Sequence, residues 1–316
     1  MSGYRILNTL NFSTCPEALD VFKGLGTVDT LPWDYDAVLS QIGEYDAYLA
    51  STSVVVDAKM IERGKKLRVI GSPATGTDHL DKHAISKAGI VCFDIAKELE
   101  LICSFTATSE LAFTLLLGLN RQLCEAVAAT RQGVWAREHF TGFQLSKKTF
   151  GILGLGRLGT ISARIAQGFG MRVIACDIRD DAQAPGVDRV DFDTLLKESD
   201  VLSIHVHLNS DTRGLVDARA LGLMKPTAIL INTARGAIVD EQALLNALSQ
   251  KQLAGAGLDV IDGEWLDDIL IHPLVQYSRT HDNLLITPHI GGATHESIND
   301  ARIFMARKVA NFLRDL

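Results

Sequence analysis

The stretch Thr149-Phe-Gly-Ile-Leu-Gly154-Leu-Gly156-Arg-Leu-Gly159 decides the fold of this 316-residue chain. Its first half is apolar and predicts a buried strand, and a helical pattern begins inside the glycine run. Gly-x-Gly-x-x-Gly between a strand and a helix is the fingerprint of a dinucleotide-binding unit. In such a unit Gly154 allows the tight turn, Gly156 lets a pyrophosphate approach the backbone, and Gly159 lets the helix pack on the strand.

An acidic residue stands where this unit needs one. Asp177 follows the next predicted strand, 18 residues after Gly159. A carboxylate there accepts hydrogen bonds from the adenosine ribose and repels a 2′-phosphate, while the helix N-terminus attracts the pyrophosphate. The pattern therefore favours NAD over NADP, although Arg179 weakens that preference.

Working outward, strand-like and helical stretches alternate along most of the chain. Apolar runs at 149–154, 171–177, 201–206, 228–233, 254–260 and 283–286 predict a six-stranded Rossmann domain. Runs at 4–7, 48–50, 67–70 and 90–93 predict another open α/β sheet of the flavodoxin-like kind. We expect an α/β protein with two doubly wound parallel-sheet domains. Residues 1–100 plus 289–316 would form a substrate domain, and residues 101–288 an NAD-binding domain.

Composition excludes several classes of protein. With 47% hydrophobic and 22% charged residues the chain is globular, and its net charge of −7 disfavours nucleic-acid binding. The apolar run 111–119 is too short for a membrane span, and the N-terminus does not resemble a signal peptide. The five cysteines are scattered and odd in number, which argues against disulfides and zinc. We expect a cytoplasmic protein that binds no membrane and no metal.

The segment 106–121 predicts a helix that is apolar on nearly every face. Such a helix must be buried. It lies either at a domain or dimer interface or in an ordinary core, and the sequence does not separate these alternatives.

Three reactive side chains come just after predicted strands: Arg235, Glu264 and His289. Open α/β sheets bind ligands at the carboxyl ends of their strands. A guanidinium can hold a carboxylate, an imidazolium can protonate a carbonyl oxygen, and a carboxylate can orient the imidazole. Taken singly, each has an ordinary explanation as a surface ion pair, a loop charge or a turn residue. Together they predict a hydride-transfer site.

The chain resembles the D-isomer-specific 2-hydroxyacid dehydrogenase family, in particular phosphoglycerate dehydrogenases without their regulatory domain. The matching blocks run in order along the sequence: ATGTDHLD (74–81), TFGILGLGRLG (149–159), NTARGAIVDEQAL (232–244), AGAGLDV (254–260) and TPHIGG (287–292).

The resemblance implies a role for individual residues. His289 would be the acid/base, Glu264 its carboxylate partner and Arg235 the substrate-binding arginine, while the amides of Thr75 and Gly76 would hold the substrate carboxylate. The implied contacts with NAD are Gly154, Gly156, Arg157, Leu158, Gly159, Asp177, Thr233, Ala234, Arg235, Asp259, His289, Gly291 and Gly292.

The function implied is NAD-dependent reduction of 2-oxo acids to D-2-hydroxy acids, with hydride from the nicotinamide and a proton from His289. Phosphoglycerate, glycerate, hydroxypyruvate and lactate-type substrates all stay open. A phosphorylated substrate would need extra cations, for which Lys97, Arg121 and Arg137 are candidates. The alternative is an NADH-sensing, corepressor-like binding protein on the same fold. We expect a homodimer in either case.

Overall fold

The chain forms two compact units in the computed structural model, which describes residues 3–264 and 268–316. The N-terminal unit comprises Met1–Phe105 and Ala293–Leu316, and the second unit comprises Thr106–Gly292. The sequence analysis placed these boundaries a few residues earlier, after 100 and 288. Each unit is built on its own parallel sheet, as the fold-class prediction requires, and that prediction is confirmed.

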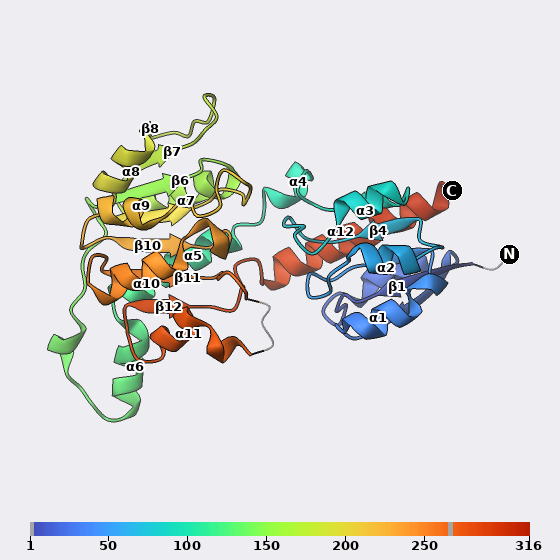
Figure 1. The fold of residues 1–316 in the computed structure, drawn as a ribbon, viewed down its shortest axis with the longest axis horizontal. Helices are drawn as coiled ribbons and strands as arrows, with labels where there is room; N and C mark the ends of the chain where they lie inside the picture. Colours follow the sequence, from blue (N-terminus) through green and yellow to red (C-terminus); the bar gives the residue numbers. More distant parts are fainter. Residues whose placement is uncertain (1–2, 265–267) are drawn as a thin grey trace. The chain divides into compact units, whose positions relative to one another are not determined.

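The N-terminal unit has the strand order β2-β1-β3-β4-β5, the flavodoxin-like order (Figure 1). Its strands are β1 (Tyr4–Asn8), β2 (Gly26–Thr30), β3 (Ala47–Leu49), β4 (Val69–Gly71) and β5 (Val91–Phe93). Its helices are η1 (Pro16–Phe22), α1 (Tyr35–Gln41), η2 (Ile42–Glu44), α2 (Ala58–Arg63), α3 (Lys82–Lys87), α4 (Leu99–Ile102) and α12 (His295–Arg314). Met305 and Val309 of α12 pack with Ile6 and Val69 in one core cluster, so the C-terminal helix returns to cover the first sheet.

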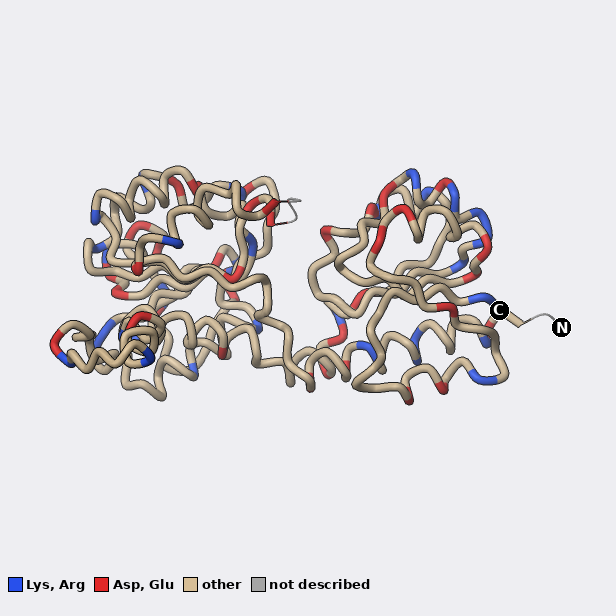
Figure 2. The backbone as a smooth tube through the Cα atoms, turned by 90° about the horizontal axis from the view of Figure 1, so that it is seen from below, with Lys and Arg blue, Asp and Glu red and all other residues tan. Residues whose placement is uncertain are grey.

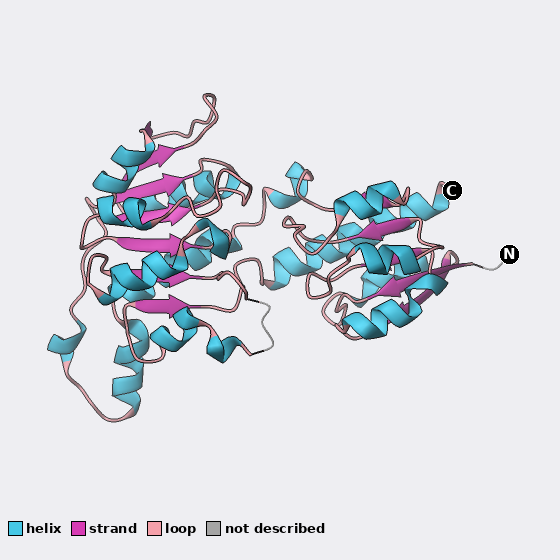
Figure 3. Ribbon diagram, viewed as in Figure 1, coloured by secondary structure: helices cyan, strands magenta, loops and turns pink. Residues whose placement is uncertain are grey.

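The second unit carries a seven-stranded parallel sheet in the order β12-β11-β10-β9-β6-β7-β8 (Figure 3). Its strands are β6 (Thr149–Leu153), β7 (Arg172–Cys176), β8 (Val187–Arg189), β9 (Val201–Ile204), β10 (Ile229–Asn232), β11 (Gly255–Leu258) and β12 (Leu284–Ile286). Its helices are α5 (Ala107–Asn120), α6 (Leu123–Arg131), η3 (Arg137–Phe140), α7 (Arg157–Gly168), α8 (Phe192–Glu198), α9 (Ala218–Leu223), η4 (Gly236–Ile238), α10 (Glu241–Ser249), η5 (Ile269–Ile271) and α11 (Pro273–Ser278). The strand order reverses at β6 and β9, which is where such sheets bind nucleotides.

Aspartates start many of the short helices. The carboxylate of each accepts the N–H of the residue three positions later, which satisfies one of the unpaired amides of the first turn. The residues that do this are Asp34, Asp57, Asp81, Asp191, Asp217 and Asp240. These caps fix the residue at which each helix begins.

The sequence analysis missed two strands, β2 and β8. Both lie at an edge of their sheet and are only partly buried. β2 reads Gly-Thr-Val-Asp-Thr and β8 reads Val-Asp-Arg, so neither has the apolar run of a central parallel strand. In Figure 2 the Lys, Arg, Asp and Glu positions lie mostly along the outside of each unit, and the tube through the middle of each unit is mostly tan.

Helix α5 is a core helix over much of its surface. Ala112, Phe113, Leu115 and Leu116 are buried in one cluster with Phe150 of β6. The stretch Leu99–Asn120, with a mean hydropathy of 1.5, is long and apolar enough by composition to cross a membrane. Its apolar character is explained within the second unit by this packing, because a helix buried against a sheet needs the same residues.

A candidate active site

His289 and Glu264 meet at the carboxyl edge of the second sheet. β11 and β12 pair in parallel with Leu258 opposite Ile286, so the turns that follow them emerge side by side. Nδ1 of His289 and Oε1 of Glu264 are 2.7 Å apart, a hydrogen-bonded ion pair when the imidazole is protonated. The structure therefore brings together two residues that are 25 positions apart in the sequence.

The electrostatics of this pair favour the charged imidazole. The hydrogen bond to Glu264 raises the pKa of His289 above its ordinary value, and it outweighs burial and the Arg235 cation, which lower it. An imidazolium is the form that can give a proton away.

His205 provides a contrast, because it also follows a strand of the same sheet. Burial of its ring lowers the pKa of His205 to about 4, and its Nε2 lies 2.9 Å from the hydroxyl of Ser203. This imidazole is therefore neutral at ordinary pH. The chemistry of the site depends on the environment of each histidine rather than on its place after a strand.

Asp259 shapes the loop that carries His289. Its buried carboxylate accepts hydrogen bonds from the Thr287 hydroxyl at 2.6 Å, the Ile290 amide at 2.8 Å and the Gly291 amide at 2.7 Å. Its backbone carbonyl accepts the amide of His289 at 2.9 Å, and His289 itself has a φ of +54°. A histidine at positive φ is strained, so this set of bonds holds the imidazole in place.

This finding adds to the sequence analysis, which assigned Asp259 only a contact with the nicotinamide. That contact stays a prediction. The Thr287 hydroxyl was not singled out at all, although it stands in the block TPHIGG that carries His289.

Arg235 begins the turn after β10. Its Nη1 donates to the carbonyl of Ala234 at 2.7 Å, and its own carbonyl accepts the side-chain amide of Asn232 at 2.9 Å. Asn232 also accepts the amide of Ala234 through Oδ1 at 3.0 Å, so one buried side chain organises the whole turn. Sequence reasoning missed Asn232, although it lies directly in the motif that ends in Arg235.

The glycine fingerprint has the geometry that a dinucleotide needs. Gly154 has a φ of +96°, and a Cβ there would lie 2.7 Å from Cγ1 of Val206. A Cβ on Gly159 would lie 2.2 Å from the carbonyl oxygen of Gly154, whereas one on Gly156 would meet nothing within 4 Å. The turn is thus closed on the protein side and open at Gly156, where α7 begins.

Asp177 is tied to the same turn. Its Oδ2 accepts the amide of Leu155 at 2.7 Å, and its Oδ1 accepts the amide of Arg179 at 2.9 Å. The guanidinium of Arg179 pairs with the carboxylate at 3.1 Å. Burial tends to raise the pKa of Asp177, but the bonds from Arg179 and Leu155 hold it below its ordinary value. The carboxylate is therefore ionised, and Arg179 lies directly over it.

Thr233 supplies an independent sign that a ligand fits here. Its Oγ1 is buried and has no hydrogen-bond partner within residues 3–264 and 268–316. Buried hydroxyls are nearly always paired. Thr233 follows β10 at the carboxyl edge, so a nicotinamide bound along this edge would give the hydroxyl a partner.

Arg157 and Leu158 of the predicted site form the start of α7, and the others lie in loops. Thr75 and Gly76 belong to the N-terminal unit, in the loop after β4, and Gly291 and Gly292 close the second unit after His289. The roles assigned to Thr75 and Gly76 stay predictions.

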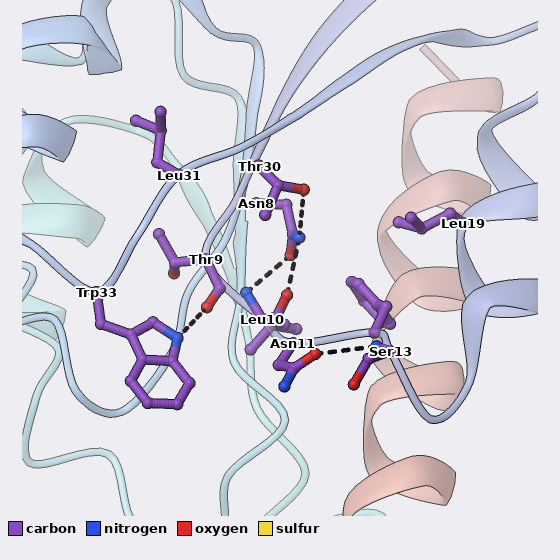
Figure 4. Close-up of a pocket in the computed structure, with 10 residues that line it drawn as sticks. Asn8, Thr9, Leu10, Asn11, Ser13, Leu19, Thr30, Leu31 and Trp33 are labelled. Carbon is purple, nitrogen blue, oxygen red and sulfur yellow. Dashed lines mark hydrogen bonds between the residues drawn. The ribbon is translucent and has the colours of Figure 1, made fainter.

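The N-terminal unit has a hollow of about 420 Å³ at the carboxyl ends of β1 and β2 (Figure 4). None of the ten described residues that line it is charged. Its polar groups pair with one another: the Trp33 indole donates to the Thr9 carbonyl, and the Asn8 amide donates to Thr30 and Leu10. The hollow therefore lacks the reactive groups that the second unit gathers.

Two doubly wound sheets, a dinucleotide fingerprint and a histidine–carboxylate pair define the class of nicotinamide-dependent oxidoreductases. Residues 113–291 match the family model described as "D-isomer specific 2-hydroxyacid dehydrogenase, NAD binding domain". The chain is 40% identical to a glyoxylate reductase of Thermococcus litoralis over 286 residues, which cover 87% of this chain and 82% of that protein.

Other relatives differ in length or are known as structures. A D-3-phosphoglycerate dehydrogenase of Synechocystis is 32% identical over 94% of this chain, but the chain spans only 52% of that protein. The crystal structure of a glyoxylate reductase from Paecilomyes thermophila is 28% identical with a TM-score of 0.84, and the match covers 99% of this chain and 96% of that one. The chain belongs to the D-isomer specific 2-hydroxyacid dehydrogenase family. It is an NAD-dependent enzyme of that family, as the sequence analysis predicted.

Proposed function

We propose that this enzyme reduces a small, unphosphorylated 2-oxo acid to the D-2-hydroxy acid, with His289 as the proton donor. The observation that carries the proposal is the 2.7 Å bond between Glu264 and a histidine whose pKa is raised. Glu264 engages Nδ1, so the proton passes to the substrate oxygen from Nε2. Bound NADH supplies the hydride.

Arg235 holds the substrate in this proposal. Its charge is felt at His289, where it opposes protonation, so the two cations share one environment. A guanidinium there can pair with the substrate carboxylate and polarise the neighbouring carbonyl. As the carbonyl oxygen gains negative charge during hydride transfer, both Arg235 and His289 stabilise it. The further contact of the carboxylate with the amides of Thr75 and Gly76 rests on the sequence resemblance.

The cofactor contacts in this proposal follow the carboxyl edge of the second sheet. The amides of Arg157 and Leu158 at the start of α7 would face the pyrophosphate, and Asp177 would accept the ribose hydroxyls once Arg179 moves aside. Arg179 is 55% exposed, so its displacement costs little packing. Ala234 and Gly292 would border the nicotinamide beside Thr233 and Asp259.

The distribution of cations favours an unphosphorylated substrate. Arg121 caps the C-terminus of α5. Leu119 of the same helix lies beside Gly255 at the start of β11, so Arg121 lies at the opposite edge of the sheet from His289. Arg137 lies in the exposed η3, beyond α6. A phosphoryl dianion needs such cations, so glyoxylate, hydroxypyruvate and similar acids fit better.

Kinetics with a panel of 2-oxo acids tests the proposal. NADH oxidation is followed with glyoxylate, hydroxypyruvate, pyruvate and phosphohydroxypyruvate. We expect turnover of an unphosphorylated acid, and His289→Ala should reduce it by about 10²-fold or more. NADH affinity, measured by fluorescence, should stay nearly unchanged. Unaltered turnover in His289→Ala would contradict the assignment, and NADH binding without turnover of any acid would favour a sensor.

We also propose that the enzyme is a homodimer. α5 and α7 border an apolar groove of about 560 Å³ that includes Phe113, Leu117, Ile161 and Phe169. Trp135 and Phe143, on the segment after α6, are 88% and 68% exposed. Apolar surface of this extent favours a second copy as its cover. Light scattering should give the mass of a dimer, twice 34.3 kDa.

The proposal extends to the compartment. All five cysteines are free thiols in the structure, and Cys103 and Cys124 are exposed. Exposed thiols persist in a reducing environment. We therefore propose that the enzyme acts in the cytoplasm, with small 2-oxo acids as its partners.

A further inference from the structure

Asp262 is clamped through both of its backbone polar groups. Its amide donates to Oε1 of Glu241 at 2.7 Å, and its carbonyl accepts Nε2 of His272 at 2.8 Å. Nε2 of His272 also lies 3.3 Å from Oε2 of Glu241. Two side chains from different elements therefore close a ring of hydrogen bonds around one residue, which lies two positions before Glu264.

The hydrogen bonds define the state of the His272 ring. The carbonyl of Asp262 can only accept, so Nε2 carries a proton. Nδ1 lies 3.3 Å from the amide of Leu274, which can only donate, so Nδ1 is an acceptor. His272 is therefore the neutral Nε2–H tautomer, and both of its nitrogens are used. Its ring is only 5% exposed, so this is a built arrangement and not a surface contact.

The clamp fixes the backbone just before Glu264. Asp262 lies two positions before Glu264, and its carbonyl is held by His272 at the start of α11. Gly236, in the turn of Arg235, packs against the same point, because a Cβ there would lie 2.2 Å from the amide nitrogen of Asp262. The turns that bear Arg235 and Glu264 are thus held against each other.

Glu264 depends on this support. Its Oε1 binds His289, whereas its Oε2 is buried without a hydrogen-bond partner in the described part of the chain. A side chain anchored by a single bond takes its position from its backbone. If the backbone from Asp262 to Glu264 moved by about 1 Å, the hydrogen bond to Nδ1 would weaken sharply.

We propose that Glu241 and His272 are positioning residues that fix the backbone of Asp262 and so keep Glu264, two residues further on, on Nδ1 of His289. The inference rests on the proposed function of the Glu264–His289 pair. Both residues act through the backbone of Asp262. Their loss should therefore change the state of His289 without removing any reacting group.

The test measures the titration of His289 by NMR in the enzyme without cofactor, so it does not depend on activity. Its signal among the nine histidines is assigned with His289→Asn. Glu241→Ala and His272→Phe each break the clamp from one side, and we expect each to lower the His289 midpoint by about one pH unit. His272→Gln keeps a donor toward the Asp262 carbonyl and should restore most of the shift. Gln242→Ala, an exposed change on the same helix, is the matched control and should leave the midpoint in place.

The kinetic counterpart is a split between turnover and binding. We expect kcat of the clamp variants to fall about tenfold or more, as for a misplaced catalytic group, while the Kd of NADH stays within about twofold. If both clamp variants fail to fold, Glu241→Gln carries the test, since it keeps the acceptor for the Asp262 amide but turns a donor toward His272. A lowered midpoint in that variant supports the proposal, and an unchanged one contradicts it.

Two further outcomes separate this inference from the proposed function. If Glu264→Gln lowers the His289 midpoint and the folded clamp variants leave it unchanged, the clamp has no positioning role and the inference fails alone. If Glu264→Gln itself leaves the midpoint unchanged, the acid/base pair is not formed in solution and the proposed function fails with it.

Discussion

Replacing Glu264 by Gln should move the pH dependence of the reduction to lower pH. The substitution keeps the volume of the side chain and removes its charge, so the bond to Nδ1 of His289 no longer favours the imidazolium. The proposed reaction consumes a proton from His289, and the rate of reduction therefore falls as pH rises through the pKa of this residue. When the pKa of His289 is lower, the rate of reduction therefore falls at a lower pH.

The magnitude follows from the geometry of the pair. A hydrogen bond to a charged group contributes about 1.5–3 kcal/mol. The two side chains are 38% and 19% exposed at a separation of 2.7 Å, so solvent screening reduces the value to about 1.5 kcal/mol. Since one pKa unit corresponds to about 1.4 kcal/mol, the midpoint should fall by about one pH unit.

The assay is the pH profile of kcat/KM for NADH-dependent reduction, compared between the two proteins. The reverse oxidation needs the neutral imidazole, so its profile should extend to lower pH in the variant. A reduction midpoint that stays within about 0.2 pH unit of the wild-type value would refute the reasoning, since one unit is the expected shift.

The same bond links folding to pH. The pKa of His289 is raised in the folded state, so the pair stabilises the protein fully below the ordinary histidine pKa of about 6.5 and loses this effect as pH rises through the raised value. With the screening just described, we expect about 1.5 kcal/mol at most. Glu264→Gln should remove this contribution to the free energy of unfolding, so denaturation curves recorded at low and high pH should no longer show it.

Three other substitutions give separate tests. Asp259→Asn places an NH₂ group among the amide and hydroxyl donors whose hydrogen bonds the carboxylate accepts. We therefore expect the free energy of unfolding, measured by urea denaturation, to fall by about 2–4 kcal/mol, together with a large loss of activity. A stable, active variant would contradict the role of Asp259 in shaping the loop. Gly154→Ala forces a Cβ to within 2.7 Å of Val206 at a φ of +96°. The affinity for NADH, measured by fluorescence, should therefore fall at least about tenfold. Wild-type affinity in this variant would show that the turn adapts to the Cβ. Asp177→Ala should weaken NADH binding and raise the ratio of kcat/KM with NADPH to kcat/KM with NADH, because Arg179 is then released to bind a 2′-phosphate. A preserved NADH preference in steady-state kinetics would contradict the roles given to Asp177 and Arg179.

Much of this site follows from sequence because parallel α/β sheets obey simple rules. The carboxyl ends of the strands share one edge, so residues after β10, β11 and β12 were expected to converge. The glycine fingerprint and Asp177 follow the same logic within a single βαβ unit. Their contacts are local, and local patterns carry that information.

Other features could not be read from the chain. β2 and β8 were missed because an edge strand buries little and needs no apolar run. Asn232 and Thr287 stand inside recognised motifs, yet their roles are to bond neighbouring backbone, which no side-chain pattern reveals.

The sequence alone thus determined the class of fold and the nucleotide turn, and it predicted which groups react. These depend on short-range patterns and on the common edge of the strands. Only the tertiary structure decided how the groups are held. Glu241 and His272 are 31 positions apart in the sequence and meet at the backbone of Asp262, and the carboxylate of Asp259 turns toward the His289 loop. Such contacts depend on the register of packed loops, to within about an ångström, and that register is set by the packing of the whole unit.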